Sequence, residues 1–272
     1  MQAQPTTFQQ TPCLRLVGRD GATALVALHG AHVLSWIPAD GRERLFLSAR
    51  AHYGAGTAIR GGIPVIFPQF AGRGALPKHG FARTTPWRLV GVSDRATFEL
   101  VPGATSAAWP HAFRARLHVG LDAGVLTVAL EIENTGAHEF AFSAALHTYL
   151  AVTDLDAVAL HGLAGRRYED STAGGAVRQQ TTAELRFNAE TDRIYVAPLH
   201  PLSLHDGPHR LRIDQHGFAD TVVWNPGATL AAGIADLAPG EHRRFLCVEA
   251  GQVLEPVHLP PGGRWSGMQR LG

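Results

Sequence analysis

The sequence predicts an all-β fold, a large antiparallel β-sandwich. Apolar and polar residues alternate along many short segments, which is the pattern of strands with one buried face. Clusters of Gly, Pro, Asp and Asn separate these segments at short intervals, as they do in sandwiches and barrels. Helical periodicity is hard to find. Because no composition break, charge run or low-complexity linker divides the chain, we expect one domain over residues 1–272.

The clearest strands lie in the middle of the chain. In residues 113–121 (FRARLHVGL) the apolar residues take one face, and two arginines and a histidine take the other. Residues 124–136, which follow a turn, and residues 139–152 continue this alternation. Shorter candidate strands, in chain order, are residues 23–30, 32–37, 87–92, 97–101, 210–214, 221–225 and 243–251. Residues 47–62 are too rich in glycine for more than a turn or two of helix.

Composition and charge exclude several classes of function. The formal net charge of +1 provides no broad basic surface for nucleic acid or a membrane. No apolar run reaches the roughly 20 residues that span a bilayer. The N-terminus, MQAQPTTFQQ, lacks the basic and apolar regions of an export signal, and Cys13 and Cys247 are too few for a disulfide framework. We therefore expect a cytoplasmic protein.

The usual motifs for metal, nucleotide and serine-hydrolase chemistry are missing. The sequence has no His-Glu-x-x-His, Cys-x-x-Cys, EF-hand loop or Gly-x-Ser-x-Gly. Residues 72–74 (GRG) neither follow a clear strand nor open a helix, so they predict no dinucleotide loop. His200, His205 and His209 lie among prolines and glycines, where we expect a solvated loop rather than a metal site.

Two polar residues stand within otherwise apolar strands. His147 follows a face of small residues in EFAFSAALHTYL, and a lone strand histidine is more often a hydrogen-bonded core residue than a catalyst. Glu249 shares a face with Phe245 and Cys247, where an ionised carboxylate needs a partner or a raised pKa. A structural ion pair with an arginine and a catalytic role both fit Glu249.

Three cations gather in loops that are rich in glycine and proline. Arg60 opens RGGIPVIFPQF, and Lys78 and Arg83 stand in LPKHGFART with His79. Glycine and proline hold such loops in fixed conformations. The planar fork of arginine suits phosphate or carboxylate, and lysine adds a point charge. This cluster therefore predicts either a solvated turn or a site for a small anionic ligand.

Six motifs, in order and at matching spacing, make the chain resemble the hexose-6-phosphate mutarotases, or glucose-6-phosphate 1-epimerases, a branch of the aldose 1-epimerase superfamily. They are RGGIPVIFPQF, LPKHGFAR, ALHTYL, ETDRIY, DTVVWNP and CVEAG. The resemblance implies a galactose-mutarotase-like β-sandwich with an open sugar site on its concave face and no cofactor. Similar proteins usually carry glutamine in place of Lys78 and tryptophan in place of Gly227.

The resemblance also assigns roles to seven residues. His147 corresponds to the family's catalytic histidine and Glu249 to its catalytic glutamate. Substrate-binding positions correspond to Arg60, Lys78, Arg83 and Asp192, and His79 to a histidine that contacts the sugar near its ring oxygen. In this interpretation Glu249 removes the proton of the C1 hydroxyl, imidazolium His147 protonates the ring oxygen, and the arginines hold the 6-phosphate.

The expected function is interconversion of the α and β anomers of a hexose 6-phosphate, with glucose 6-phosphate as the first candidate. The expected partner is therefore a small-molecule hexose phosphate, and the protein is expected to be a monomer. A non-catalytic sugar-binding module on the same sandwich is one alternative, and a mutarotase of unphosphorylated aldoses is another. A glycoside hydrolase normally needs two facing carboxylates, whereas the sequence offers one strong candidate.

Overall fold

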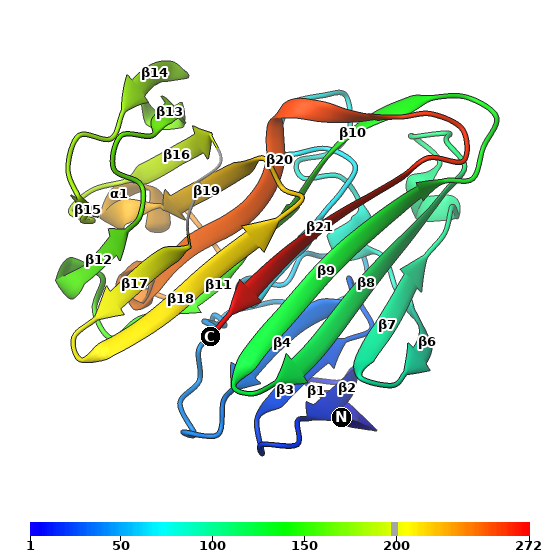
Figure 1. Ribbon diagram of the computed structural model, residues 1–272, viewed down its shortest axis with the longest axis horizontal. Coiled ribbons are helices and arrows are strands. Elements are labelled where there is room, and N and C mark those ends of the chain that lie inside the picture. The colour runs from blue at the N-terminus through cyan, green and yellow to red at the C-terminus, as the bar shows by residue number, and fades with distance from the viewer. Residues whose placement is uncertain (197–200) are drawn as a thin grey trace.

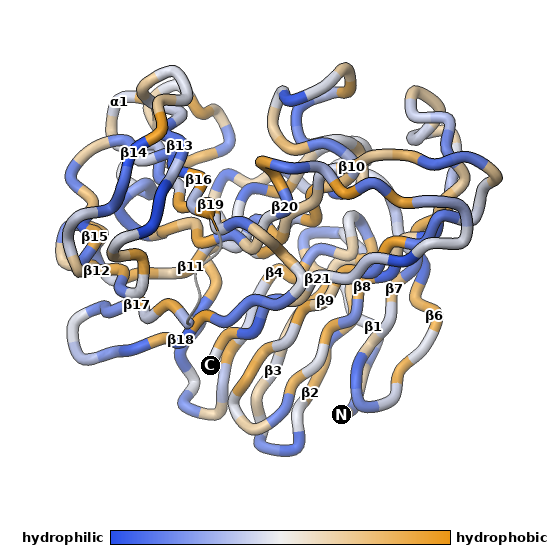
Figure 2. Tube along the Cα trace, turned by 45° about the horizontal axis from the view of Figure 1, so that its top comes forward, coloured by the Kyte–Doolittle hydropathy of each residue, from blue (hydrophilic) through white to orange (hydrophobic). Residues whose placement is uncertain are grey.

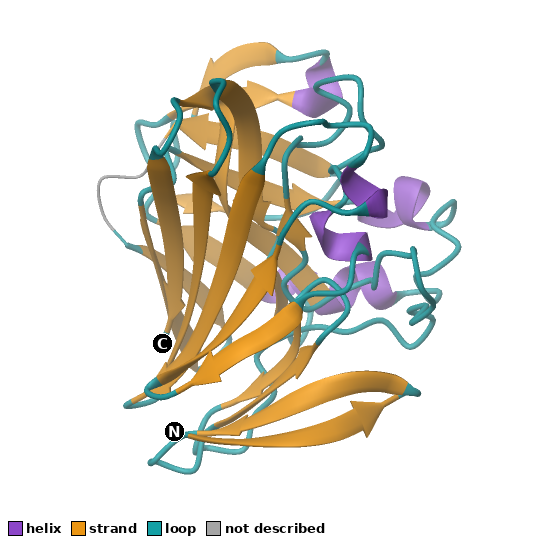
Figure 3. Cartoon of the chain, turned by 90° about the vertical axis from the view of Figure 1, so that its right-hand side faces the viewer, coloured by secondary structure: helices purple, strands orange, loops and turns teal. Residues whose placement is uncertain are grey.

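Three antiparallel sheets build the protein in the computed structural model, which describes residues 1–196 and 201–272 (Figure 1). The N-terminal sheet has four strands in chain order, β1 (Gln2–Phe8), β2 (Thr11–Val17), β3 (Thr23–Ala27) and β4 (His32–Ile37). Figure 3 shows this small sheet lying beside the two larger ones. The predicted all-β class with antiparallel sheets is confirmed.

The second sheet has nine strands and carries the longest regular hairpin. Its order is β15 (Glu184–Leu185), β12 (Val158–His161), β17 (Leu202–Asp206), β18 (His209–His216), β21 (Arg264–Leu271), β9 (Val125–Asn134), β8 (Phe113–Asp122), β7 (Arg95–Leu100) and β6 (Arg88–Val92). Buried and partly exposed residues alternate without a break along β8 and β9, as the sequence predicts. Figure 2 shows the same alternation of apolar and polar residues along the tube.

The third sheet has eight strands and faces the nine-stranded sheet. Its order is β14 (Ala176–Gln179), β13 (Arg167–Asp170), β16 (Thr191–Val196), β19 (Asp220–Asn225), β20 (Phe245–Leu259), β10 (Phe140–Leu146) and β5 (Val65–Ile66), and β11 (Tyr149–Ala151) also pairs with β20. Leu117 and Leu130 of the nine-stranded sheet share one apolar cluster with Phe142, Leu246 and Val248 of this sheet. The main core therefore lies between the two large sheets.

Helical structure is limited to short turns. The single α-helix in the described residues is α1 (Gly227–Ala231), and the 3₁₀ turns are η1 (Ala82–Thr84), η2 (Ala104–Ser106), η3 (Leu155–Ala157), η4 (Ser171–Ala173) and η5 (Glu241–Arg244). Most of them lie on the side opposite the nine-stranded sheet (Figure 3). None of the helices within residues 1–196 and 201–272 is long and apolar enough to cross a membrane.

Two predictions about local structure are wrong. Residues 139–152 are not one strand, because β10 ends at Leu146 and β11 begins at Tyr149. Between them the backbone N–H of His147 donates to Pro64 O at 3.0 Å, so a loop replaces the strand partner there. His205 lies in β17 and His209 begins β18, so neither stands in a loop, and His200 lies outside the described residues.

Strands β1, β2, β5, β12 to β17 and β21 are additions to the predicted set. Several of them are short or lack strict alternation, and tertiary pairing rather than local pattern defines them. Cys13 and Cys247 are both free and buried. The single domain, the monomeric state and the cytoplasmic location stay predictions.

Candidate functional site

All seven residues singled out in the sequence line one pocket of about 280 Å³ on the eight-stranded sheet. Its polar lining comes from Arg60, Lys78, His79, Arg83, His147, Asp192 and Glu249. Six further residues complete it: Phe70, Ala71, Val222, Trp224, Leu230 and Ile234. The volume suits a small ligand rather than a polymer chain.

Neighbouring strands bring the titratable residues of the pocket together. Glu249 lies in β20 directly opposite Val222 of β19, and Asp192 of β16 lies opposite Trp224 of the same strand. His147 stands in the break between β10 and β11, both of which pair with β20. The break therefore places the imidazole beside Glu249, on the adjacent strand.

His147 and Glu249 form a close, buried pair. His147 Nδ1 lies 3.3 Å from Glu249 Oε1, and the two residues are 7% and 1% exposed. Neither Nδ1 of His147 nor Oε2 of Glu249 has a hydrogen-bond partner among the described residues. Buried polar atoms normally have partners, so these two unpaired atoms are a sign of a site prepared for another molecule.

Burial moves the pKa values of the pair in opposite directions. Loss of solvation, helped by the nearby Asp192 carboxylate, raises the pKa of Glu249 well above its usual range. Loss of solvation, followed by His79, Arg83 and Arg60, holds the pKa of His147 well below its usual range. Both shifts favour the neutral form of each group in the unliganded protein, whereas the sequence interpretation has a carboxylate beside an imidazolium. The neutral pair and the ion pair hold the same number of protons and differ by one transfer between them.

His79 is a second buried imidazole in the pocket, with its ring 5.5 Å from that of His147. The backbone N–H of Ala71 donates to His79 Nδ1 at 3.2 Å. Burial and the cations Arg83, Lys78 and Arg60 lower the pKa of His79 to about 2. The ring is thus neutral, and because Nδ1 accepts, Nε2 carries the proton and can donate to a ligand oxygen.

The three cations differ in how far their charges are already compensated. Arg60 donates from Nε to Asp236 Oδ1 at 3.1 Å and from Nη1 to the Tyr149 hydroxyl at 2.9 Å. Arg83 donates from Nη2 to the carbonyl of Lys78 at 3.0 Å, and its buried Nε has no partner among the described residues. The guanidinium of Arg83, with the exposed Lys78, therefore supplies the less compensated positive charge.

The structure adds residues that sequence reasoning missed. The Tyr149 ring stacks on His147 with centroids 4.8 Å apart and planes 10° apart. Trp224 stands edge-on to the same imidazole at 5.9 Å. Tyr149 is two residues after His147 in ALHTYL, and that spacing on a strand could have signalled a shared face. Asp236 gave no local signal, because its partner Arg60 is far away in the sequence.

The backbone conformation and its close neighbour explain why glycine stands at position 227. Its φ is +61°, and an added Cβ would lie 2.6 Å from the backbone N of Glu190. Gly227 begins α1. The apolar wall of the pocket near this helix comes from Trp224, Leu230 and Ile234, not from a tryptophan at position 227.

Asp192 gives the pocket a second carboxyl group, and burial raises its pKa. In the described part of the chain, no three His, Cys, Asp or Glu side chains are placed to hold a metal ion. That the protein uses no cofactor stays a prediction.

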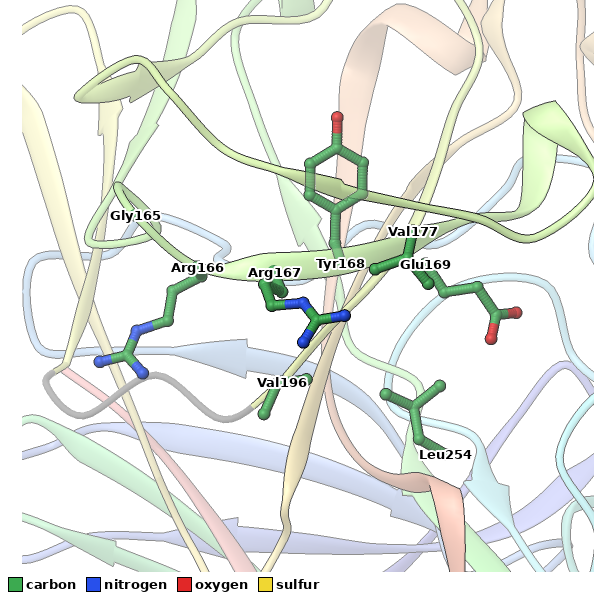
Figure 4. A pocket seen from close by; sticks show the side chains of 8 residues that line it. All are labelled: Gly165, Arg166, Arg167, Tyr168, Glu169, Val177, Val196 and Leu254. Atoms are coloured by element: carbon green, nitrogen blue, oxygen red, sulfur yellow. The ribbon is translucent and has the colours of Figure 1, made fainter.

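Another pocket, of about 500 Å³, lies at the outer edge of the eight-stranded sheet (Figure 4). Arg167 extends toward the gap between Val196 and Leu254. The walls of this pocket include Arg166, Tyr168 and the exposed Val177 and Val196. None of the seven predicted residues lines it. It also lacks a close acid and base, so the smaller pocket is the candidate site.

The comparisons with known proteins identify the family of the chain. The model of the family described as aldose 1-epimerase matches residues 12–272. A relative from Salmonella typhimurium, named "Putative glucose-6-phosphate 1-epimerase", is 35% identical over 276 residues, which span 93% of this chain and 91% of the relative. A relative of the same name from Cenchrus ciliaris is 33% identical over 268 residues, which span 93% of this chain and 82% of the relative.

Solved structures show the same fold. The crystal structure of a "putative mutarotase (YeaD)" from Salmonella typhimurium superposes with a TM-score of 0.90 at 30% identity and covers 99% of this chain and 92% of that one. A galactose mutarotase-like protein from Lactobacillus casei, at 17% identity, superposes with a TM-score of 0.75 over 95% of this chain and 99% of that one. The galactose-mutarotase-like fold is thus confirmed.

Proposed function

Because the chain belongs to the aldose 1-epimerase family, we propose that it interconverts the α and β anomers of hexose 6-phosphates, with glucose 6-phosphate as the first substrate. The observation that carries this proposal is the pocket itself. It combines an acid and base pair, His147 Nδ1 and Glu249 Oε1 at 3.3 Å, with three cations. Relatives named for glucose 6-phosphate, at 33–35% identity, support the phosphorylated substrate.

The reaction needs one base and one acid. In the proposed mechanism, the proton of Glu249 first passes to His147, which gives a carboxylate and an imidazolium. Glu249 then takes the proton of the C1 hydroxyl while His147 gives its proton to the ring oxygen, and the C1–O5 bond breaks. The open-chain aldehyde rotates about C1–C2. Reversal of both transfers closes the ring on the other face and returns the carboxylate and the imidazolium. Passage of the proton from His147 back to Glu249 then restores the starting protonation state.

The rest of the pocket has a proposed role in holding the sugar. His79 Nε2–H donates to a sugar oxygen, and Asp192 accepts from a hydroxyl. Trp224 and Phe70 provide apolar surface for the C–H face of the ring. Arg60, Arg83 and Lys78 bind the phosphate, and Arg83 and Lys78 contribute more of the free charge because Asp236 already compensates part of the charge of Arg60.

One observation favours a second candidate, a mutarotase of unphosphorylated aldoses. Arg60 is already bonded to Asp236 and Tyr149, so the number of uncompensated cations is smaller than the sequence predicts. Anomer exchange measured by NMR on glucose 6-phosphate, glucose and galactose separates the two candidates. Exchange above the uncatalysed rate with free sugars alone would favour the second.

The phosphate role is tested with Arg83→Ala. A charge-assisted hydrogen bond contributes about 1.5–3 kcal/mol, so we expect kcat/KM for glucose 6-phosphate to fall roughly 10- to 150-fold. Any turnover of free glucose should be unchanged. Arg88→Ala, which removes an exposed arginine paired with Glu99, is the matched control. An equal loss with both substrates would mean that Arg83 acts on the fold or the chemistry, and the phosphate proposal would fail.

A further inference from the structure

A buried turn is bonded to the segments that carry both arginines of the pocket. We call residues 28–32 (LHGAH), which connect β3 to β4, the support turn. His29 Nε2 lies 2.7 Å from the carbonyl oxygen of Thr57, and His32 Nε2 lies 2.7 Å from that of Gly61. The two histidines therefore hold the loop that carries Arg60 at two points, at Thr57, which precedes Arg60 in the sequence, and at Gly61, which follows it directly.

The support turn also contacts the segment that carries Arg83. The backbone N–H of Gly30 donates to Thr85 O at 2.8 Å. The φ of Gly30 is +73°, and an added Cβ would lie 2.7 Å from the carbonyl oxygen of Arg83. Only glycine can approach the Arg83 backbone this closely. One element thus supports two arginines that are distant in the sequence.

The loop after Arg60 is closely packed against neighbouring backbone. A Cβ on Gly61 would lie 2.3 Å from Phe46 O, and one on Gly62 would lie 2.3 Å from Val33 O. The N–H of Gly62 donates to Phe46 O at 2.7 Å. These backbone contacts pack the loop against Phe46 and Val33, and the imidazole of His32 adds a side-chain hydrogen bond to the same loop.

The bond of His32 requires one tautomer. A carbonyl oxygen can only accept, so Nε2 of His32 must carry the proton. His32 is 0% exposed, and burial lowers its pKa to about 3, so the ring is neutral. Its Nδ1 has no hydrogen-bond partner among the described residues. Within the described residues, the hydrogen bond that His32 Nε2 donates to the carbonyl of Gly61 is therefore the one polar contact of this ring.

We propose that the support turn positions the phosphate-binding arginines, and that His32 is the positioning residue for Arg60 through its Nε2–H bond to Gly61. This inference rests on the proposed function for its effect on substrate. Neither His29 nor His32 belongs to the lining of the pocket, so neither touches the sugar. Their effect on activity passes through the placement of the guanidinium groups.

The variants His32→Leu and His32→Gln separate a positioning bond from simple filling of space. The amide nitrogen of glutamine can reach the place of Nε2 and donate to Gly61, whereas leucine fills the volume and cannot donate. Small displacements of a binding group cost up to about 100-fold, so we expect His32→Leu to raise KM for glucose 6-phosphate roughly 10-fold or more. The kcat and the turnover of free glucose should not change, and His32→Gln should restore the wild-type KM.

A second measurement does not depend on the substrate. Arg60 Nε–H donates to Asp236, so its NMR resonance should be resolved and slow to exchange in the wild type. We expect faster exchange in His32→Leu and recovery in His32→Gln. The matched control is His118→Leu, which removes an imidazole bonded to Thr97 on the nine-stranded sheet. It should leave both KM and the Arg60 resonance unchanged.

The outcomes distinguish this inference from the proposed function. If the wild type does not exchange the anomers of glucose 6-phosphate, the proposed function fails, and the Arg60 resonance still decides the positioning role. If His32→Leu keeps both the wild-type resonance and the wild-type KM, the positioning role is overturned. Should His32→Leu not fold, the pair His29→Leu and His29→Gln tests the same support through Thr57.

Discussion

At the scale of single residues, the pocket depends on one carboxyl group with an unusual environment. Glu249 is almost fully buried on β20, and its salt-bridge partner within 4 Å is the imidazole of His147 rather than an arginine. The sequence left two interpretations of Glu249 open, a structural ion pair with an arginine and a catalytic role. No arginine is paired with it among the described residues, which disfavours the first. Its catalytic role is the prediction that remains to be tested.

We expect Glu249→Gln to abolish anomer exchange without unfolding the protein. The amide has the shape of the carboxyl group but cannot accept the C1 proton, and general-base catalysis typically contributes about 10²–10⁴-fold. NMR exchange rates and a thermal melt measure the two effects. Exchange close to the wild-type rate would contradict the assignment of Glu249 as the base.

His147→Asn should be similarly inactive and should still bind the sugar phosphate. The change removes the proton donor, while Arg83, Lys78 and His79 remain in the pocket. Binding measured by calorimetry, beside the exchange rate, gives the comparison. Lower thermal stability with normal turnover per folded molecule would instead make His147 a core histidine.

At the scale of elements, the break between β10 and β11 is the feature that aims His147. The ladder of β20 continues past the break, with Ala250 opposite Leu146 and Cys247 opposite Tyr149. The loop at Gly62 and Pro64 supplies the missing backbone partners there. A plain strand would have kept the alternation that the sequence predicts, whereas residues 144–150, which span the break, are all buried.

We expect Gly227→Ala to destabilise the protein more than Gly240→Ala does. Both glycines have positive φ, +61° and +81°, so both alanine variants carry about 1–2 kcal/mol of backbone strain. An added Cβ at Gly227 also meets the backbone of Glu190, whereas Gly240 has nothing within 4 Å. Urea unfolding should show a further loss of about 1–3 kcal/mol for Gly227→Ala. Equal losses would mean that α1 shifts at little cost.

At the scale of the whole molecule, buried neutral histidines make stability depend on pH. Their folded-state pKa values lie near 3 for His32 and near 2 for His79, below the ordinary value of 6.5. Between those values the unfolded chain binds more protons than the folded one. Stability is therefore fully present above pH 6.5 and is lost as the pH falls towards about 3. Glu249 has the opposite sign, because its raised pKa favours the folded state at lower pH.

The buried histidines predict that the free energy of unfolding falls as the pH is lowered, and that His32→Gln makes this fall smaller. Each buried neutral histidine adds a slope of about 1.4 kcal/mol per pH unit in that range. We expect the free energy of unfolding, measured in urea between pH 7 and 5, to fall less steeply in His32→Gln by about that amount. The same slope in the variant and the wild type would show that His32 titrates normally.

The sequence by itself determined the class of fold and the list of polar residues in the pocket. Alternation along residues 113–121 and 124–136 is local, since each side chain's face depends only on its place in the strand. The candidates His147, Glu249, Arg60, Lys78, His79, Arg83 and Asp192 came from local oddities and family motifs, and all of them line one pocket. The roles assigned to them stay predictions.

Tertiary structure alone decided how these residues are paired and protonated. The salt bridge of Arg60 with Asp236 and the contact of His147 with Glu249 join segments far apart in the sequence. Burial, which no local pattern reports, favours the neutral forms of the acid and the base and of His32. The physical reason is that solvation and Coulomb energy depend on distances in space, whereas strand periodicity depends on neighbours along the chain.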